Sequence, residues 1–484
     1  MTAPGTGLDH GLAAGLDTVA QARALLEAGA TSTELVGAAL ARATEVEHLA
    51  AFASVDGERA LARAARLDGA APLGPLHGVP IVLKDNVAQA GLANRAGSRV
   101  LPDVPAPADA TVTARLEAAG AVVVGRTNMH ELAWGGTTDN PHLGTCRNPW
   151  DPARVAAGSS GGTAAAVAAG VVPVGIGTDT GGSVRLPSAV TNLTGLRPTL
   201  GAIPTDGVVP LAWTLDTVGP MGRSAADCLA LWDVIADAPA GRPSGAQVPV
   251  PLVPADGGPA DAPFAGLRVG VLTDHALRDL QPGVELAVLG LLGSLLHGGA
   301  VVEEVALPDL ELMVDALVVV DAAEPSAVHA RSVRDHPELI GADVLAQLLA
   351  GAELGAVEYL QAQRFRTHLG AHLERLWSRV DVLVSPTLPF TAPLVGERLV
   401  TINGVEVDNL RANMRFTSLP SLTGCPAVSL PAGFDEAGLP VGAQLVAAPG
   451  RDRDLLLLAA RVQEVTDHHR RRPPSSASSA SSAG

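Results

Sequence analysis

The sequence is poor in lysine, in aromatic residues and in cysteine, and the shortages exclude several classes of protein. Its 484 residues include 33 Lys or Arg against 50 Asp or Glu, which gives a net charge of −17. Proteins that bind nucleic acid regardless of sequence need a basic surface, so this acidic balance argues against nucleic-acid binding. Three scattered cysteines form neither a disulfide framework nor a paired metal-ligand motif. The sequence therefore predicts no metal site.

Lys84 is the only lysine in the chain, and every other basic residue is an arginine. Arginine keeps its proton at accessible pH, whereas a desolvated lysine can lose it. Lys84 directly follows the apolar stretch 79–83. A lysine at the end of a buried strand is a candidate general base. Composition alone leaves the alternative open that Lys84 is a stray surface residue in a chain with biased codon usage.

Neither a secretory signal nor a membrane span is visible in the sequence. The residues before Arg23 contain no lysine or arginine and no apolar core of the signal type. Residues 155–178 carry no charge, but glycine, serine and proline interrupt them, and their apolar residues are mainly Ala and Val. We interpret this segment as buried core, since it is too weakly hydrophobic for lipid. The sequence thus predicts a cytoplasmic globular protein without membrane contact.

Helical and extended patterns alternate through most of the chain. Thr31 and Glu34 form a capping box at the start of a helix, and Asp109 is the expected N-cap of a helix that ends at Ala119. A sheet covered by helices on both faces explains this alternation, so the predicted fold class is α/β. The sequence predicts strands over residues 121–124, 171–176, 269–272 and 380–384, and helices over 164–169 and 282–296.

A single large domain is predicted for residues 1–469. The stretch 238–263 is rich in Pro, Gly and Ala, and we interpret it as a loop within that domain. A domain boundary there is the alternative. From residue 470 the chain continues with Arg, Pro and then Ser/Ala repeats, which predicts a disordered tail over 470–484.

Two loops rich in glycine and serine flank an alanine-rich helix and the strand after it. The first loop spans 157–163 and contains Ser159; the second spans 177–185 and contains Ser183. The helix and strand between them can bring the two serines together. Ordinary turns are the alternative for each loop. The phosphate-loop ending Gly-Lys-Ser/Thr and the G-x-S-x-G elbow are both absent, and His130-Glu131 lacks the second histidine of a zinc motif.

The order and spacing of three stretches resemble the amidase signature family. These are residues 78–86, 158–163 and 178–185. Ala157 departs from the family pattern, which often has a second glycine there. The resemblance implies a mixed, twisted sheet and a hydrolase that cleaves amide C–N bonds through an acyl-enzyme, without a cofactor. It continues through 127–129, 148–150, 196–199, 215–220, 385–387 and 440–444, and so covers nearly the whole chain before the tail.

The same resemblance implies a Ser–cis-Ser–Lys triad. It falls on Ser183 as nucleophile, on Ser159 (preceded by a cis peptide bond) as proton relay, and on Lys84 as base. Such a lysine needs a pKa several units below its usual value of about 10.4. The resemblance places the oxyanion hole at the backbone N–H groups of Thr180, Gly181, Gly182 and Ser183, and supporting roles at Ser160, Thr178, Asp179 and Arg185.

The expected substrate is a small-molecule amide, and three segments are expected to shape its pocket. They are 129–140, 203–213 and 319–330, which we take to be loops, with Met129, Trp134 and Trp213 as candidate walls. A place in the core is the alternative for each tryptophan. Dimers are frequent in this family, so the resemblance also suggests a homodimer.

Other functions remain open within the same fold. One is the glutaminase (A) subunit of a tRNA-dependent amidotransferase; others are hydrolysis of carbamates, aryl amides or esters, or a non-catalytic binding module. A glutamine site needs charged groups for the ammonium and carboxylate of the amino acid. Residues 413–417, Asn-Met-Arg-Phe-Thr, supply no acid where one is expected. The sequence therefore favours a simple amidase.

Overall fold

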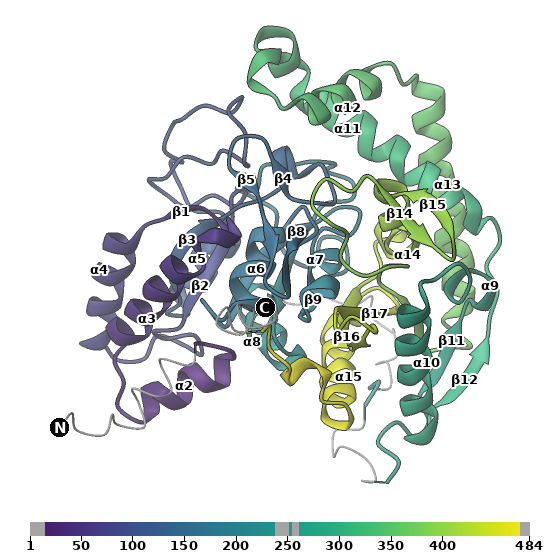
Figure 1. The fold of residues 1–484 in the computed structure, drawn as a ribbon, viewed down its shortest axis with the longest axis horizontal. Coiled ribbons are helices and arrows are strands. Elements are labelled where there is room, and N and C mark those ends of the chain that lie inside the picture. Colours follow the sequence, from purple (N-terminus) through teal and green to yellow (C-terminus); the bar gives the residue numbers. More distant parts are fainter. Residues whose placement is uncertain (1–14, 238–250, 254–260, 475–484) are drawn as a thin grey trace, which may run out of the picture.

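A mixed sheet of eleven strands crosses the molecule from one side to the other (Figure 1). The computed structural model describes residues 15–237, 251–253 and 261–474. In spatial order the strands are β1 (Phe52–Val55), β3 (Val122–Thr127), β2 (Pro80–Lys84), β8 (Val174–Asp179), β10 (Thr217–Gly222), β9 (Thr194–Arg197), β16 (Ala427–Phe434), β17 (Pro440–Ala447), β13 (Val382–Pro386), β11 (Arg268–Val271) and β12 (Val301–Glu304).

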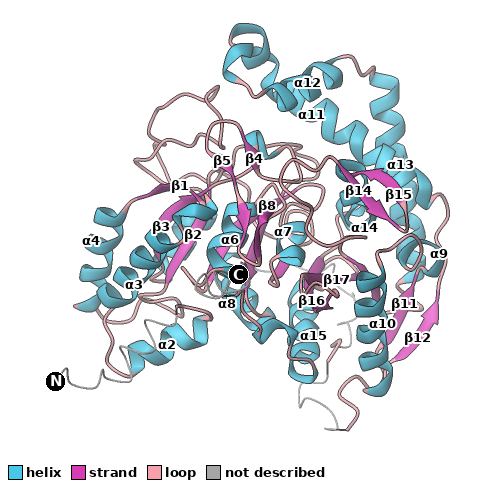
Figure 2. Ribbon diagram, viewed as in Figure 1, coloured by secondary structure: helices cyan, strands magenta, loops and turns pink. Residues whose placement is uncertain are grey.

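Two parallel blocks of this sheet lie on either side of an antiparallel middle. The strand β2 runs parallel to both β3 and β8, and β11 runs parallel to both β12 and β13. The strands from β8 to β13 that lie between these blocks pair antiparallel. Helices lie on both faces (Figure 2). The predicted α/β fold with a mixed sheet is confirmed.

The helices pack on the sheet through small and aliphatic side chains. In the N-terminal half, the alanine-rich α6 contacts β8, and all of its residues are buried. In the C-terminal half, α10 and α15 contact β16 and β17. The helices are α2 (Val19–Glu27), α3 (Ser32–Glu45), α4 (Gly57–Asp68), α5 (Thr111–Ala118), α6 (Gly161–Ala168), α7 (Arg185–Val190), α8 (Ala225–Ile235), α9 (Thr273–Ala276), α10 (Pro282–His297), α11 (Met313–Asp335), α12 (Ala342–Ala352), α13 (Ala356–Leu376), α14 (Asn409–Thr423) and α15 (Asp452–Val465).

Two long helices form a hairpin beside the sheet rather than on it. The helices α11 and α12 pack against each other and lie at the top of the view in Figure 1, and α13 and α14 also contact α11. Short strands and 3₁₀ turns complete the described chain. They are β4 (Asp139–Asn140) with β5 (Gly144–Thr145), β6 (Arg147–Asn148) with β7 (Asp151–Val155), the ribbon β14 (Leu399–Ile402) with β15 (Val405–Asp408), and the 3₁₀ turns Glu47–Leu49, Glu131–Ala133, Leu310–Leu312, Pro337–Leu339 and His468–Arg470.

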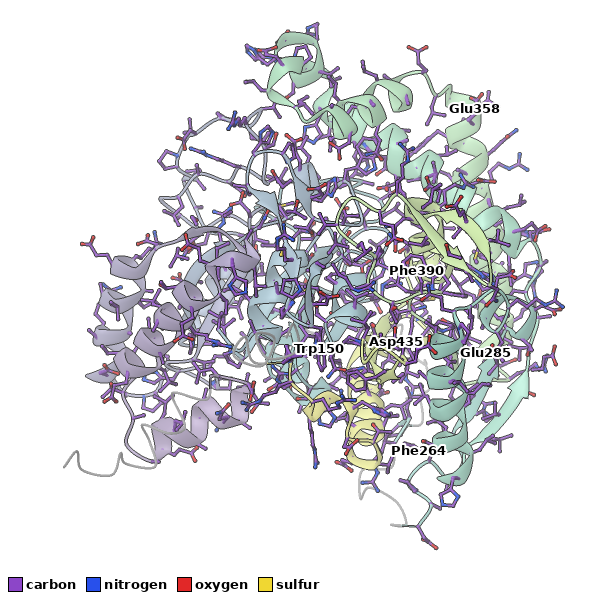
Figure 3. All side chains as sticks on the ribbon, in the orientation of Figure 1. Trp150, Phe264, Glu285, Glu358, Phe390 and Asp435 are labelled. Atoms are coloured by element: carbon purple, nitrogen blue, oxygen red, sulfur yellow. The ribbon has the colours of Figure 1, made fainter. Side chains whose placement is uncertain are left out.

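Side chains fill the space between these ribbons (Figure 3). Trp150, labelled there, donates its indole N–H to the carbonyl oxygen of Thr191 at 3.0 Å, and its ring centre lies 5.2 Å from that of Phe434. The segment before the Gly/Ser loop at 157–163 is thereby anchored to the region after α7 and to β16. Trp150 thus links the N-terminal part of the chain to β16 in the C-terminal part.

Several sequence predictions of element position are confirmed, and two are wrong. The capping box of Thr31 and Glu34 is present at the start of α3. Asp109, however, does not cap α5: its carboxylate accepts from the backbone N–H of Ala90 at 2.7 Å, and Ala110 is the N-cap. The segment 319–330, taken for a loop, lies inside α11. Its mixed apolar and acidic residues gave no periodic signal, although α12 and α13 hold it in a helix.

The C-terminal prediction needs a shift of its boundary. Residues 470–474, assigned to the disordered tail, lie against the rest of the protein. The side-chain amide of Asn192 donates to the carbonyl oxygen of Arg471 at 3.2 Å, and the Arg471 guanidinium lies over the Phe434 ring at 3.8 Å. Arg472 forms an ion pair with Asp17. Residues 475–484, and most of the predicted loop 238–263, lie outside the described residues.

None of the helices within the described residues is long and apolar enough to cross a membrane. The uncharged segment 155–178 instead forms the end of β7, the helix α6 and most of β8. Its residues are buried. This agrees with the interpretation of that segment as core.

Candidate active site

Lys84 lies at the end of β2 with no exposed surface. Its Nζ is 2.7 Å from Ser159 Oγ and 2.8 Å from Thr178 Oγ1, and 3.4 Å from the carbonyl oxygen of Thr178. Burial lowers the pKa of Lys84 to about 7, because removal from water disfavours the charged ammonium; Asp179 and Asp216 oppose this by their negative charge. A substantial fraction of the Lys84 amine is therefore uncharged near neutral pH.

Ser159 follows a cis peptide bond to Gly158 in the loop before α6. Ala157 has a φ of +57°, in the left-handed region that glycine adopts most easily. This explains why glycine is frequent at that position of the family pattern. Thr138 supports the loop, since its hydroxyl donates to the carbonyl oxygen of Ala157 at 2.8 Å and accepts from the backbone N–H of Gly161 at 3.1 Å.

Ser183 lies in the loop between β8 and α7, beside the Ser159 loop. The backbone N–H of Ser160 donates to the carbonyl oxygen of Ser183 at 3.2 Å and fastens the two loops together. The Ser160 hydroxyl also donates to the carbonyl oxygen of Thr178 at 3.2 Å. Among the described residues no hydrogen bond joins the hydroxyls of Ser159 and Ser183. Ser183 is partly exposed and lines a cavity, whereas Ser159 is fully buried.

The loop before Ser183 presents backbone donors without acceptors. Within the part of the chain that the structure describes, no group accepts from the backbone N–H of Gly181, Gly182 or Ser183. Gly182 has a φ of +141°, and a Cβ there would lie 2.9 Å from both Thr417 and Leu186. Glycine is therefore required at this turn. Backbone donors without protein partners at the edge of a cavity are suited to bind a negatively charged oxygen.

A buried ion-pair network holds this loop in place. The Asp179 carboxylate accepts from the Arg185 guanidinium at 2.9 and 3.0 Å and from Arg197 at 3.0 Å. Burial alone would raise the pKa of Asp179, but the charges and hydrogen bonds of Arg185 and Arg197 hold it well below its usual value. Arg185 also donates to Gln444 at 2.7 Å. These contacts tie the loop to β9 and to Gln444 of β17.

Asp216 braces the other side of the same loop. Its carboxylate accepts from the Thr180 hydroxyl at 2.5 Å and from the backbone N–H groups of Leu211 and Ala212 at 2.9 and 3.2 Å. Burial raises the pKa of Asp216 to about 6, although these hydrogen bonds favour the ionised form. Thr180 is thus fixed by its side chain while its backbone begins the turn that carries Ser183.

A cavity of about 190 Å³ opens onto Ser183. Most of its lining is small or apolar, and Asp321 is the only ionisable side chain among the described residues that line it. Asn413 and Gln347 add neutral amides. The lining residues are Ala133, Trp134, Gly135, Gly136, Gly158, Gly181, Ser183, Leu186, Leu211, Val318, Asp321, Ala322, Gln347, Ala350, Leu410, Asn413 and Met414.

The comparison with known proteins gives the family of this chain. A family model described as Amidase matches residues 34–456. The chain belongs to the amidase family. It is a hydrolase of amide C–N bonds. The glutamyl-tRNA(Gln) amidotransferase (A) subunit of Symbiobacterium thermophilum is 37% identical over 475 residues, which cover 92% of this chain and 95% of that protein. Its counterpart in Deinococcus radiodurans is also 37% identical, over 93% of this chain and 98% of that protein.

A solved structure described as an amidase aligns with a TM-score of 0.83 at 34% identity and covers 92% of this chain and 99% of its own. The large mixed sheet is therefore the amidase fold. In this amidase, the buried amine of Lys84 contacts Ser159 and Thr178, the Ser160 hydroxyl bonds to the backbone of Thr178, and Thr180 to Ser183 form the adjoining turn.

The predicted pocket walls are correct in region but not in every residue. Each of the three predicted segments contributes to the cavity, through Trp134, Leu211 and Asp321, for example. Met129 does not line it: it is fully buried in a core cluster with Leu132. Trp213 is also absent from the lining and is 54% exposed. An apolar side chain in the right segment gives no information on which way it points.

Sequence reasoning missed three charged groups of this region, Arg197, Asp216 and Asp321. Arg197 and Asp216 stand inside stretches of the family resemblance, but nothing in their spacing shows that both contact the loop before Ser183. The strand pairing of β8 with β10 and of β10 with β9 brings them there. The signal that could have identified Asp321 is the presence of one acidic residue in the otherwise apolar run 316–323 of α11.

Within the described residues, no group of three or more His, Cys, Asp or Glu could hold a metal ion.

Proposed function

We propose that this amidase hydrolyses a small, largely apolar amide with Ser183 as nucleophile, Ser159 as proton relay and Lys84 as base. One observation carries the proposal. The only lysine of the chain is buried, its pKa is lowered to about 7, and its Nζ lies 2.7 Å from Ser159 Oγ. A structural lysine would need an anionic partner, whereas the neighbours of this amine are two hydroxyls and a carbonyl.

The three oxygen neighbours of Lys84 Nζ can be satisfied by an uncharged amine as well as by an ammonium. A neutral amine that uses two N–H groups as donors has one lone pair left as acceptor. The hydroxyl and the carbonyl oxygen of Thr178 can accept the two N–H groups, and the lone pair then faces the Ser159 hydroxyl. In this state Ser159 donates its proton to Lys84. The amine is arranged to accept a proton from a single neighbour, which is what a general base requires.

The proposed reaction moves protons along these three side chains. Lys84 takes the Ser159 proton, Ser159 takes the proton of Ser183, and Ser183 Oγ attacks the substrate carbonyl carbon. The contact between the two serine hydroxyls forms in the reacting complex, since catalytic hydrogen bonds often tighten only there. The backbone N–H groups of Gly181, Gly182 and Ser183 stabilise the oxyanion. The proton returns through Ser159 to the leaving nitrogen, the amine departs, and water hydrolyses the acyl-enzyme.

The cavity lining supports a substrate without a carboxylate. The cavity offers aliphatic and glycine surface, the Trp134 ring and two neutral amides, but no cationic side chain among its described lining residues. A carboxylate on the substrate would enter this space without a partner, which is costly in a buried site. A neutral carboxamide with an alkyl or aryl acyl group meets no such cost.

A second candidate function is the glutaminase component of a tRNA-dependent amidotransferase. The curated relatives at 37% identity carry that name, and this favours the second candidate more than the sequence analysis did. The cavity favours the first candidate, because the carboxylate of glutamine finds no cation there and Asn413 stands where an acid was sought. The predicted homodimer and cytoplasmic location stay predictions.

A fluorophosphonate probe tests the nucleophile assignment. The expected result is a single covalent adduct on the peptide that contains Ser183, with no adduct in Ser183→Ala at equal melting temperature. The serines at 159 and 160 serve as internal controls in the same digest. An adduct on Ser159, or labelling that survives in Ser183→Ala, contradicts the proposal.

A panel of amides separates the two candidate functions. The purified chain alone is expected to hydrolyse aliphatic carboxamides and anilides and to leave glutamine unchanged. Glutamine hydrolysis that appears only with a co-purified partner protein, and no turnover of simple amides by the chain alone, would favour the amidotransferase component. Liberated ammonia or aniline is the direct readout for each substrate.

A further inference from the structure

We propose that Asp321 is a specificity-determining residue that binds a cationic nitrogen on the substrate, so that the preferred substrates are amides carrying an amino group apart from the amide that is cleaved. This inference rests on the proposed function, because it concerns the substrate of the same cavity. It names a residue on α11 that belongs to none of the stretches that carry the family resemblance.

Asp321 is the one ionisable group among the described residues lining the cavity that Ser183 also lines. Its Oδ1 is buried, and no group in the described part of the chain hydrogen-bonds to that oxygen. The Trp134 side chain, another lining residue, hydrogen-bonds to the carboxyl. An acceptor oxygen left without a partner, on a residue that lines the cavity, has an unmet hydrogen-bonding capacity.

The negative charge around Asp321 favours a cationic ligand over an anionic one. The neighbouring acids Asp216 and Glu324 add negative charge, and Glu324 is held by Thr214 and Tyr359. Burial, reinforced by these two acids, raises the pKa of Asp321 well above its usual value, while the Trp134 contact opposes the shift. The cavity therefore favours the protonated form of Asp321 more than water does. A cation that enters would favour the ionised carboxylate instead.

The neighbouring acids already accept hydrogen bonds from other residues, whereas Asp321 Oδ1 has no partner among the described residues. Asp216 accepts one hydrogen bond from Thr180 and two from the backbone at 211–212. Both Glu324 oxygens accept from Thr214, and one of them also accepts from Tyr359. Arg197 lies near Asp216, and Arg366 lies near Glu324. Both carboxylates thus have hydrogen-bond partners and a nearby arginine within the protein. No arginine or lysine is among the groups that shift the pKa of Asp321. A cation on the substrate can therefore form an ion pair with its carboxylate.

A primary amine is the chemical class that this environment fits. An alkylammonium presents three donors and one positive charge, and the apolar lining formed by Leu186, Val318 and Met414 accommodates the methylene chain that connects it to the amide. A substrate carboxylate would meet the negative potential of Asp321 and its neighbours. Free amino acids are thus disfavoured, while ω-amino carboxamides are favoured.

The test compares isosteric substrate pairs. The probes are 4-aminobutanamide, 5-aminopentanamide and 6-aminohexanamide, each beside the alkyl carboxamide with the same number of heavy atoms. In the wild type, the amino substrate of the best-fitting length is expected to have a kcat/KM about 10-fold or more above its neutral partner. The ratio within each pair cancels effects on the Ser183 chemistry itself.

The variants are Asp321→Asn and, as a matched control, Asp335→Asn. Asp321→Asn should lower the amino-to-neutral ratio of kcat/KM by about 10-fold or more, mainly through KM. Asp335 lies on the same helix, is exposed and pairs with Arg334, so Asp335→Asn should leave the ratio unchanged. Melting curves establish that both variants fold. If Asp321→Asn does not fold, Asp321→Glu is used, and a shift of the preferred chain length by one methylene is expected.

Calorimetry gives a second readout that needs no turnover. The Ser183→Ala variant is titrated with 5-aminopentanamide by calorimetry in buffers of different ionisation enthalpy at neutral pH. Tighter binding is expected with Asp321 present than after Asp321→Asn in the same background, and any proton release on binding should be greater with Asp321 present. An equal ratio in the wild type and Asp321→Asn, or equal binding with and without Asp321, overturns the proposal. If the wild type cleaves neither member of any pair while the calorimetry still shows tighter binding with Asp321 present, the proposed function fails and the role of Asp321 stands.

Discussion

The cavity joins two regions that are built in different ways. The serine side consists of Lys84, Ser159, Thr178 and Ser183, carried by strand ends and tight loops in the middle of the sheet. The helix side consists of Asp321, Ala322, Gln347 and Ala350, carried by the hairpin of α11 and α12 beside the sheet (Figures 1 and 2). On the serine side, the polar side chains around the amine are hydrogen-bonded, whereas on the helix side one carboxyl oxygen has no partner among the described residues.

The difference between the two sides indicates a division of labour. A buried strand end can hold an amine uncharged and keep its neighbours within hydrogen-bonding distance, so the chemistry belongs there. The helix α11 packs on α13 and α14 and meets the serine side through a few contacts, such as the hydrogen bonds from Thr214 to Glu324. The reaction should therefore depend steeply on the serine side, and the choice of substrate on the helix side.

The largest loss is expected on replacing the base. Lys84→Met keeps the length and the apolar stem but removes the amine, and kcat should fall by ~10⁴-fold. Lys84→Arg should be nearly as damaging, because arginine does not lose its proton. Lys84→Met should also retain or gain stability, since a costly buried amine is gone. Rate measurements and thermal melts on both variants check this, and turnover near the wild-type rate in Lys84→Arg would refute the proton-transfer scheme.

The relay serine comes next in the expected order. Ser159→Ala removes the hydroxyl between Lys84 and Ser183, and kcat should fall by ~10³-fold with KM little changed. Ser160→Ala is the matched neighbour, because the Ser160 hydroxyl contacts only the backbone of Thr178 among the described residues. The fall in kcat for Ser160→Ala should be at least ten-fold smaller than the fall for Ser159→Ala. Equal losses in the two variants would mean that the loop as a whole, rather than the Ser159 hydroxyl, matters.

Much of the serine side is predictable from sequence, because short motifs encode local geometry. The Gly/Ser loops and the buried position of Lys84 follow from residues close together in the chain, whereas the cis bond at Gly158–Ser159 is predicted only through the family resemblance. The brace from Asp216 to Thr180 and that from Arg197 to Asp179 depend on strand order across the sheet, which no local pattern specifies. The helix side is harder still. Whether Trp134 or Trp213 faces the cavity depends on packing against α11, far away in the sequence.

The brace on the turn before Ser183 is expected to have an intermediate effect. Thr180→Val removes the hydroxyl that donates to Asp216, so the backbone donors lose part of their alignment. We expect kcat to fall about 10-fold, less than the 10²–10³-fold typical of removing a donor outright. Thr180→Ser restores the hydroxyl and should recover most of the rate. Failure of Thr180→Ser to recover activity would assign the effect to packing of the methyl group instead.

The smallest effects are expected where the two tryptophans are compared. Trp134→Ala should lower kcat/KM about 10-fold through loss of cavity wall, with KM carrying most of the change. Trp213→Ala should stay within about twofold of the wild type, because this side chain is exposed and does not line the cavity. Steady-state kinetics on a neutral carboxamide measure both. A larger effect at Trp213 would mean that the cavity extends beyond the lining described above.

One titration tests the central claim directly, because the chain contains a single lysine. In protein grown with lysine labelled by ¹³C at Cε, the spectrum contains one lysine signal, and its shift against pH gives the pKa of Lys84. The account predicts a midpoint at about 7 in the folded enzyme and a return to about 10.4 in the urea-unfolded chain. A midpoint near 10 in the folded enzyme would mean that Lys84 remains an ammonium at neutral pH, and the proposed base would be wrong.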